Sequence, residues 1–270
     1  MKRLMALIML VGCALYSTPA SAATTASHPI AQFGYTASEF ARTHAATGGY
    51  WYDRSRAYMW GTPPAKPYAA STGCRHYTSY AKFASDVANH EISTAKYPCV
   101  LLDLEGGKGW PAPAAEMANP RKYMPLFNKL ARLHGFLPIE VPAADLHRTD
   151  TTCGGSSNMA YYLNCKLARY AAEGGADVLV QDQSKQAEQS AYRDWYLTAK
   201  SQAHSVYASS VVFSTCSQAR GPASGCISDL LSIGKSAAMG LEIMQDTNAD
   251  ARSAHGWLAT VLDTLRTDGW

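Results

Sequence analysis

Short apolar runs alternate along the chain with segments in which apolar residues recur at helical spacing. The runs are rich in Val, Ile, Leu or aromatic residues, and Gly, Pro, Asn or Ser bound them, as is typical of buried strands. They cover residues 30–35, 50–52, 100–105, 137–141, 178–183, 210–215 and 241–245. We therefore expect six or seven strands.

The best-defined helical segment lies between Asn119 and Gly135. Asn119 is a favoured N-cap residue, Pro120 suits the first helical position, and Gly135 suits the C-terminal end. Apolar residues recur at helical spacing within it, namely Tyr123, Leu126, Phe127, Leu130 and Leu133. Similar patterns follow residues 77, 164, 190 and 253, so helices are expected between the strands.

The alternation of strands and helices predicts the fold class. A spacing of about 30 to 40 residues between strands indicates right-handed βαβ units and a parallel sheet. The chain has no glycine-rich phosphate loop of either common kind, which argues against a dinucleotide-binding sheet. We expect an α/β fold of the (β/α)8-type (TIM-like) barrel, incomplete or distorted in one unit, with disulfide-stapled loops. The working face of such a barrel lies where its strands end.

The N-terminal residues have the pattern of an export signal. Lys2 and Arg3 precede a short apolar segment, and a small-residue cleavage pattern ends at Ala22. We expect residues 1–22 to be removed and residues 23–270 to form a single barrel domain that is secreted. The alternative is a lipoprotein anchored at Cys13, because residues 10–13 resemble a lipobox.

Charge and hydropathy narrow the range of partners. Loss of Lys2 and Arg3 lowers the formal net charge from +3 to +1, so no basic excess is left to attract nucleic acid or an anionic membrane. No later stretch approaches the roughly 20 apolar residues that a membrane span needs. We expect a monomer without a cofactor that binds a carbohydrate or another small polar ligand.

Six cysteines remain after Cys13, an even number that indicates disulfides in an exported chain. Their spacings lack the paired C-x-x-C units of a zinc site. Two close pairs each bracket a loop rich in Gly and Ser, and the remaining two cysteines form the third pair. The expected pairs are Cys153 with Cys165, Cys216 with Cys226, and Cys74 with Cys99.

Two acids stand at the end of the clearest strand, in the stretch CVLLDLEGGKGW. Side chains alternate along a strand, so Leu101, Asp103 and Glu105 share one face, which we place inside the barrel. The two acids are separated by about 6.6 Å of strand rise, close enough for one carboxyl group to raise the pKa of the other. A protonated acid beside an ionised one suits glycosidic bond cleavage.

The same alternation assigns polar residues of other strands to the barrel interior. Facing Leu137, Ile139 and Val141 outward turns Glu140 inward, as a third candidate catalytic acid. Gln181 and Gln183 are expected inside as substrate-binding residues, and Glu242 and Gln245 are equal candidates on the last strand. No histidine is expected on the inward face. The competing interpretation of these acids is structural, as salt bridges or caps.

Aromatic residues supply further candidates for ligand binding. Trp51 and Tyr52 belong to an early aromatic cluster with Asp53 beside them, and Trp110 follows the acid pair among glycines and prolines. Flat rings with polar edges suit the faces of sugars. We include Trp51, Asp53 and Trp110 among the substrate-binding candidates; core packing is the alternative for the rings.

The D-x-E strand end within an exported barrel resembles the active strands of glycoside hydrolase families 18 and 25. That resemblance implies Glu105 as the acid and Asp103 as its partner, acting on sugars that carry an N-acetyl group. The segments LLDLEGGKGWPAPAAEMANPRKY, HGFLPIEVPAADL and DVLVQDQ resemble those of uncharacterised secreted bacterial TIM-barrel proteins, which implies the fold.

Three classes of function stay open. The first is a secreted glycosidase-like hydrolase that uses Glu105 with Asp103 or Glu140. The second is a metal-dependent hydrolase in which the same carboxylates bind Mg²⁺ or Ca²⁺; the lack of an expected inward histidine weakens it. The third is a non-catalytic barrel that binds a carbohydrate or a peptide.

Overall fold

The computed structural model describes residues 30–32, 57–60, 71–106, 111–235, 239–244 and 256–270. Within these residues, the strands are β1 (Ile30–Gln32), β2 (Ala57–Trp60), β3 (Ser71–Tyr77), β4 (Cys99–Leu104), β5 (Leu137–Pro142), β6 (Asp177–Val180), β7 (Val212–Ser217) and β8 (Met239–Met244). Each strand pairs in parallel with the next, and β8 pairs with β1. The hydrogen-bonded order therefore closes on itself.

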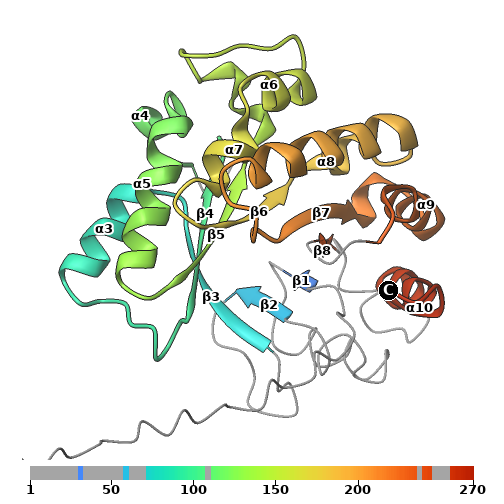
Figure 1. Cartoon of the computed structure of the whole chain (residues 1–270), viewed down its shortest axis with the longest axis horizontal. Coiled ribbons are helices and arrows are strands. Elements are labelled where there is room, and N and C mark those ends of the chain that lie inside the picture. Colours follow the sequence, from blue (N-terminus) through green and yellow to red (C-terminus); the bar gives the residue numbers. More distant parts are fainter. Residues whose placement is uncertain (1–29, 33–56, 61–70, 107–110, 236–238, 245–255) are drawn as a thin grey trace, which may run out of the picture.

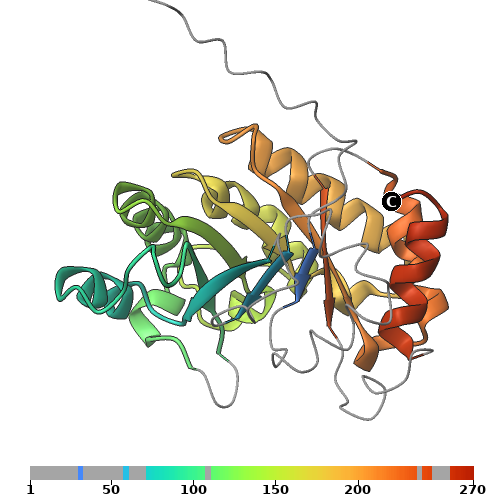
Figure 2. The ribbon, with the colours of Figure 1, turned by 90° about the horizontal axis from the view of Figure 1, so that it is seen from below.

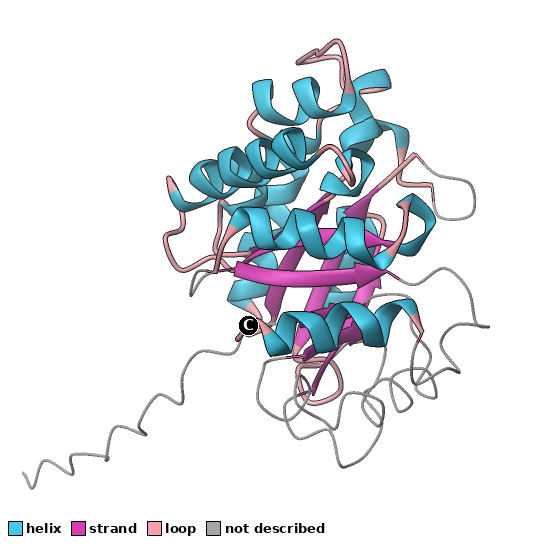
Figure 3. Ribbon diagram, turned by 90° about the vertical axis from the view of Figure 1, so that its right-hand side faces the viewer, coloured by secondary structure: helices cyan, strands magenta, loops and turns pink. Residues whose placement is uncertain are grey.

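Helices cover the outside of the strands (Figure 1). They are α3 (Tyr80–Ala88), α4 (Ala114–Met117), α5 (Pro120–Leu133), α6 (Asn158–Asn164), α7 (Leu167–Ala172), α8 (Gln189–His204), α9 (Ala223–Ile233) and α10 (Trp257–Thr267). Three 3-10 turns follow β5, β6 and β7: η1 (Ala144–Arg148), η2 (Asp182–Lys185) and η3 (Gln218–Arg220). Figure 3 shows the helix layer packed against the strands.

The fold is a partial TIM-like barrel. Strands β3 to β8 form a half-barrel of six parallel strands, each followed by a helix in the described part of the chain. The remaining strands are short, with three residues in β1 and four in β2, and they join β3 to β8 (Figure 2). The expected α/β class and parallel sheet are confirmed, but the molecule is not a regular barrel of eight full units.

The apolar side chains of the strands fall into two clusters. The inner cluster, inside the barrel, contains Tyr58, Cys74, Cys99, Leu101, Ile139, Val141, Leu179, Val211 and Phe213. The outer cluster lies between strands and helices and includes Val100, Leu102, Leu104, Val178, Val180, Leu241 and Ile243. A Cβ atom at Gly240 would lie 2.3 Å from the Phe213 ring, so the packing of β7 against β8 inside the barrel requires glycine there.

The two ends of helix α5 agree with the prediction from the sequence. The helix begins at Pro120 after the N-cap Asn119, and it ends at Leu133. Gly135 follows with a φ of +79°, a left-handed conformation that side chains other than glycine rarely adopt. The predicted helices after residues 77, 164, 190 and 253 correspond to α3, α7, α8 and α10.

All three expected disulfides are present: Cys74–Cys99, Cys153–Cys165 and Cys216–Cys226. The Cys74–Cys99 bridge joins paired neighbours on β3 and β4, and both of its cysteines are fully buried in the inner cluster. Disulfides of this number are typical of proteins from oxidising compartments. The predicted export signal and Cys13 lie outside the described residues.

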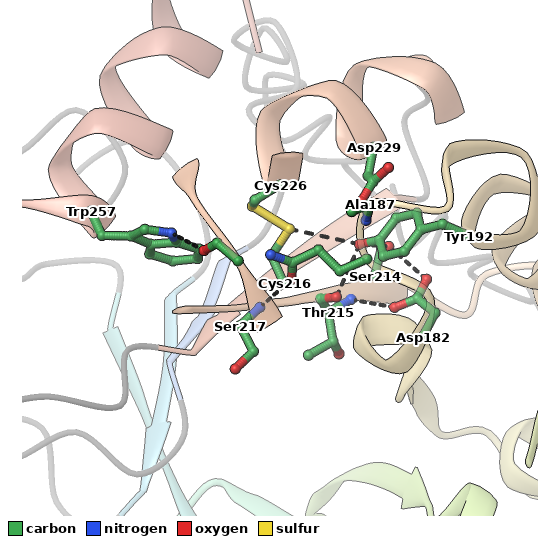
Figure 4. Close-up of a disulfide and its surroundings, with 12 residues drawn as sticks. Asp182, Ala187, Tyr192, Ser214, Thr215, Cys216, Ser217, Cys226, Asp229 and Trp257 are labelled. Atoms are coloured by element: carbon green, nitrogen blue, oxygen red, sulfur yellow. Dashed lines mark hydrogen bonds between the residues drawn. A yellow bond between two sulfur atoms is a disulfide. The ribbon is translucent and has the colours of Figure 1, made fainter. Parts of the chain in front are cut away.

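A buried hydrogen-bond network fixes the ends of β6 and β7 on the outer side of the sheet. Asp182 accepts bonds from the backbone N–H of Thr215 and the hydroxyl of Ser214, each 2.8 Å long. The Tyr192 hydroxyl of α8 in turn donates to the backbone oxygen of Thr215, over 3.0 Å. Figure 4 shows this network beside the Cys216–Cys226 disulfide. It holds Thr215 in place.

No described helix is long and apolar enough to span a membrane.

Candidate active site

Asp103 and Glu105 lie on the inner face at the carboxyl end of β4, as the alternation predicts. Leu101 belongs to the inner cluster, and Asp103 pairs across the ladder with Val141, which belongs to the same cluster. Residues that pair directly in a parallel ladder point to the same side of the sheet. Only 16% of the Asp103 side chain is exposed. The two acids therefore share the end of the barrel where this fold places its chemistry.

His76 contacts this pair from the neighbouring strand β3. Its Nε2 atom lies 3.6 Å from Oδ2 of Asp103, and its ladder partner on β4 is the inward Leu101. The expectation that no histidine faces inward was therefore wrong. The strand that carries His76 has the polar sequence STGCRHY, in which the apolar pattern of a strand is missing.

Burial and mutual repulsion set the acidity of the pair. The pKa of Asp103 is raised, chiefly by burial, while the contact with the imidazole of His76 acts against that rise. The pKa of Glu105 is also raised, first by burial and next by the charge of Asp103. Asp145, on the turn η1 after β5, raises the pKa of both. The sequence analysis did not single out Asp145, although its place in a βα loop was a signal.

Gln181 directly contacts the acid pair. Its Nε2 donates to Oε1 of Glu105 over 2.8 Å, a bond that lowers the pKa of Glu105 against the larger effect of burial. Gln183 is placed differently from the prediction, because β6 ends at Val180 and Gln183 belongs to the turn η2. Strand alternation therefore does not apply to it. Its Oε1 atom is buried and lacks a hydrogen-bond partner among the described residues.

Glu242 is the residue of β8 that faces the acid pair. It pairs with Thr215 on β7, whereas its neighbours Leu241 and Ile243 belong to the outer cluster. The pKa of Glu242 is raised to about 8 by burial, and the charges of Asp103 and Glu105 add to the rise. Of the two candidates on this strand, Glu242 therefore takes the inward position. Gln245 lies outside the described residues.

Glu140 faces the helices and not the barrel interior, so its predicted orientation was wrong. Its ladder partners are Leu102 and Val178, both in the outer cluster, whereas Ile139 and Val141 fill the inside. The side chain is 1% exposed, and neither carboxyl oxygen has a hydrogen-bond partner among the described residues. Burial raises the pKa of Glu140 well above its usual value. This position argues against a catalytic role.

Three aromatic and acidic candidates lie outside the described residues: Trp51, Asp53 and Trp110. Their roles stay predictions. The described residues therefore bring together Asp103, Glu105, Gln181 and Glu242 from the sequence-based set, and they add His76, Asp145 and Thr215.

In the described part of the chain, no group of three His, Cys, Asp or Glu side chains is arranged to hold a metal ion. The carboxyl groups at the end of β4 and on β8 suit proton transfer. Burial and the charges of Asp103 and Glu105 raise the pKa of Glu242 to about 8, so this carboxyl group holds its proton at neutral pH, whereas the contact with His76 favours the ionised form of Asp103.

No protein-family model matches the chain, and the comparison with curated proteins finds no match. One similar solved structure is described as "Native KDPGal structure"; it has 12% sequence identity and a TM-score of 0.38, over 90% of this chain and 97% of that chain. Another is described as "Structure of a cube-shaped, highly porous protein cage designed by fusing symmetric oligomeric domains", with 14% identity and a TM-score of 0.36, over 89% and 72%. Such slight likenesses carry no argument about function.

Proposed function

We propose that this protein is a hydrolase of glycosidic bonds that works through the carboxyl pair Asp103 and Glu105. One observation carries the proposal: both acids lie on the inner face at the carboxyl end of β4, and the charge of Asp103 raises the pKa of Glu105. A structural salt bridge would instead place a cation on each acid and lower both pKa values. The pair thus has the asymmetry that acid-base cleavage requires.

The roles of proton donor and ionised acid follow from the neighbours of each acid. Glu105, with its raised pKa, is the proton donor to the oxygen of the leaving sugar as the bond from that oxygen to the anomeric carbon breaks. Asp103, whose ionised form His76 favours, carries the negative charge that stabilises the developing positive charge on the ring. Water supplies the hydroxyl group to the anomeric carbon and returns a proton to Glu105, so the cycle balances.

Neighbouring side chains would hold the substrate. The amide of Gln181 fixes the direction of the Glu105 carboxyl group, and Glu242 faces the pair from β8. The predicted ring contacts of Trp51 and Trp110 belong to the same proposal, as does a sugar with an N-acetyl group. A neutral, polyhydroxylated ligand fits the small net charge of the chain.

Two broader predictions form part of this proposal. The closed strand order supports a (β/α)8-type plan, in which the first two described strands are short. The three disulfides support secretion of residues 23–270 as a single domain after removal of the signal, with attachment at Cys13 as the alternative. Membership of the secreted bacterial barrel proteins that the sequence resembles is proposed on the same grounds.

The test compares the parent with Glu105→Gln for release of reducing ends from chitin, peptidoglycan and cellulose. An amide cannot donate the proton, so hydrolysis should fall by about 10² to 10⁴-fold, the usual contribution of general acid catalysis. Glu91→Gln is the matched control, because Glu91 is exposed and lies in the turn after α3. Retained hydrolysis in Glu105→Gln would reject Glu105 as the acid.

Thermal unfolding of the same samples separates catalysis from scaffolding. Removing one of two repelling acids should leave the melting temperature of Glu105→Gln equal to or above that of the parent. A buried structural pair would lose about 3–5 kcal/mol on removal of one partner. Activity that requires added Mg²⁺ or Ca²⁺ would favour the metal-dependent hydrolase, and binding of the polysaccharides without turnover would favour the non-catalytic barrel.

A further inference from the structure

The hydroxyl group of Thr215 lies between two oxygen atoms, each of which can accept a hydrogen bond. Its Oγ1 is 2.7 Å from the backbone oxygen of Val180 and 2.8 Å from Oε2 of Glu242. Thr215 and Val180 are fully buried, and Glu242 is 5% exposed. Both contacts have the length of an ordinary hydrogen bond between oxygens.

The number of available hydrogens determines which atom donates in each of these two contacts. A hydroxyl group has one hydrogen, and a backbone carbonyl can only accept. The hydrogen between Thr215 and Val180 must therefore come from Thr215. The hydrogen between Thr215 and Glu242 must then come from the carboxyl group, which is protonated. If Thr215 instead donated to Glu242, two lone-pair oxygens would face each other at 2.7 Å in a buried place.

The surroundings of Glu242 favour the same protonation state. Asp103 and Glu105 on β4 face it, and their charges raise its pKa; the hydrogen bond of Thr215 to the ionised form would act in the opposite direction. Thr215 is the side chain that pairs with it from β7, and Ala31 on β1 is its backbone partner on the other side. An ionised Glu242 would add a further negative charge beside Asp103.

We infer that Glu242 is a neutral acid in the folded protein and serves the site as a hydrogen-bonding group for a hydroxyl of the ligand, not as an ionised carboxylate. Its Oε2–H is engaged by Thr215, which leaves Oε1 to accept from the ligand. Thr215 is the positioning residue. The choice of a carbohydrate hydroxyl as the ligand group rests on the proposed function; the protonation state of Glu242 does not.

The first experiment measures melting temperatures of the full chain and of Glu242→Gln between pH 5 and pH 9. Glutamine mimics the protonated acid, since its amide donates to Thr215 and it cannot ionise. The parent should lose stability relative to the variant as pH rises from the unfolded pKa of about 4.3 to the folded pKa of about 8, so the difference widens over that range. A difference that stays constant, or narrows, would overturn the inference.

A second measurement applies where Glu242→Gln does not fold. The parent, labelled with ¹³C at the glutamate carboxyl groups, is titrated by NMR beside Thr215→Val, which removes the hydroxyl. A carboxyl signal that titrates near pH 8 and shifts in Thr215→Val supports the inference. A spectrum without such a signal contradicts it.

The second experiment follows binding of chitotetraose by calorimetry at pH 7 and pH 9. A ligand that binds only the protein with neutral Glu242 should lose about tenfold in affinity for the parent, as expected for loss of one proton with a pKa near 8, whereas the ratio of affinities in Glu242→Gln should stay near one. Equal losses in both proteins, or no binding by the parent, would overturn the role in ligand recognition. Binding with this pH dependence but without hydrolysis would count against the proposed function alone.

Discussion

The imidazole of His76 on β3 lies 3.6 Å from the carboxyl group of Asp103 on β4, with both side chains on the inner face of the barrel. This contact is the main influence that opposes the effect of burial on Asp103. It gives the two acids of one strand different environments, because Glu105 receives a neutral amide from Gln181 and not an imidazole. The difference between the two acids therefore depends on β3 and β6.

Replacing His76 should change the pH at which Asp103 loses its proton. In His76→Leu the pKa of Asp103 rises, because the contact with the imidazole that lowered it is gone. If Asp103 acts in its ionised form, the acidic limb of the pH profile of kcat/KM moves to higher pH. His76→Gln keeps a hydrogen-bond donor and should show a smaller displacement. An acidic limb that stays in place in both variants would exclude Asp103 as its source.

Gln181→Leu tests how the hydrogen bond from Gln181 changes the pKa of Glu105. Loss of the amide donor removes the bond that lowers the pKa of Glu105, so this pKa rises and the alkaline limb of the pH profile moves to higher pH. Gln181→Asn, which is shorter by one methylene group, serves as a comparison that keeps the amide. ¹³C NMR titration of Glu105 gives the same information in the absence of substrate. A downward displacement would show that Gln181 acts through something other than this bond.

Reduction of the Cys74–Cys99 disulfide should destabilise the barrel. The bridge joins β3 to β4 inside the inner cluster and closes a loop with a sequence separation of 25 residues. Its loss is expected to lower the free energy of unfolding by about 3 kcal/mol. The double variant Cys74→Ala/Cys99→Ala isolates this bridge, and Cys153→Ala/Cys165→Ala, on a more exposed loop, is its comparison. Equal melting temperatures of the first variant and the parent would contradict the expected contribution.

Glu116 should be a structural acid in contrast to the site acids. Its carboxyl oxygens accept hydrogen bonds from the Ser79 hydroxyl and from the backbone N–H groups of Tyr80 and Ala81, at 2.9, 2.7 and 3.0 Å. They thus satisfy the N-terminus of α3. Glu116→Gln turns an amide toward one of these donors and should lower stability by about 1–3 kcal/mol in urea unfolding. The exposed Glu91→Gln should stay within about 0.5 kcal/mol of the parent.

The sequence predicted the elements whose chemistry is local. Asn119, Pro120 and Gly135 mark the ends of α5 through capping and backbone preferences that depend on a few neighbouring residues. The close cysteine pairs bracket short loops and pair as expected. The D-x-E ending of β4 required only strand alternation and one correct choice of the inner face.

The wrong or missing predictions concern features that depend on residues distant in the sequence. Strand alternation tells which residues share a face, but in a barrel both faces are apolar, so it does not tell which face is inside. Ile139 and Val141 were taken as the helix-facing side of β5, and the structure places them inside, which reverses Glu140. β3 was missed because pairing with β2 and β4, and not an apolar pattern, makes it a strand; His76 was missed with it.

Glu140→Met should stabilise the protein. The carboxyl group of Glu140 is buried on the outer side of β5 without a hydrogen-bond partner among the described residues, and burial raises its pKa well above the usual value. Such an unsatisfied polar group costs about 1–3 kcal/mol, and methionine is a flexible apolar side chain that fills the space. We expect a gain of this order at pH 7 in urea unfolding.

The pH dependence of that gain identifies its cause. Because the folded pKa of Glu140 lies above the unfolded one, the unfolded parent ionises first, and the parent loses stability as pH rises from about 4.3 toward the folded pKa. The advantage of Glu140→Met should therefore be smaller at pH 4.5 than at pH 7. Glu140→Gln cannot ionise but still lacks partners, so it should show the pH-dependent part of the gain without the apolar part. A loss of stability in Glu140→Met at pH 7 would mean that Glu140 has a partner after all, and it would reopen the question of its role.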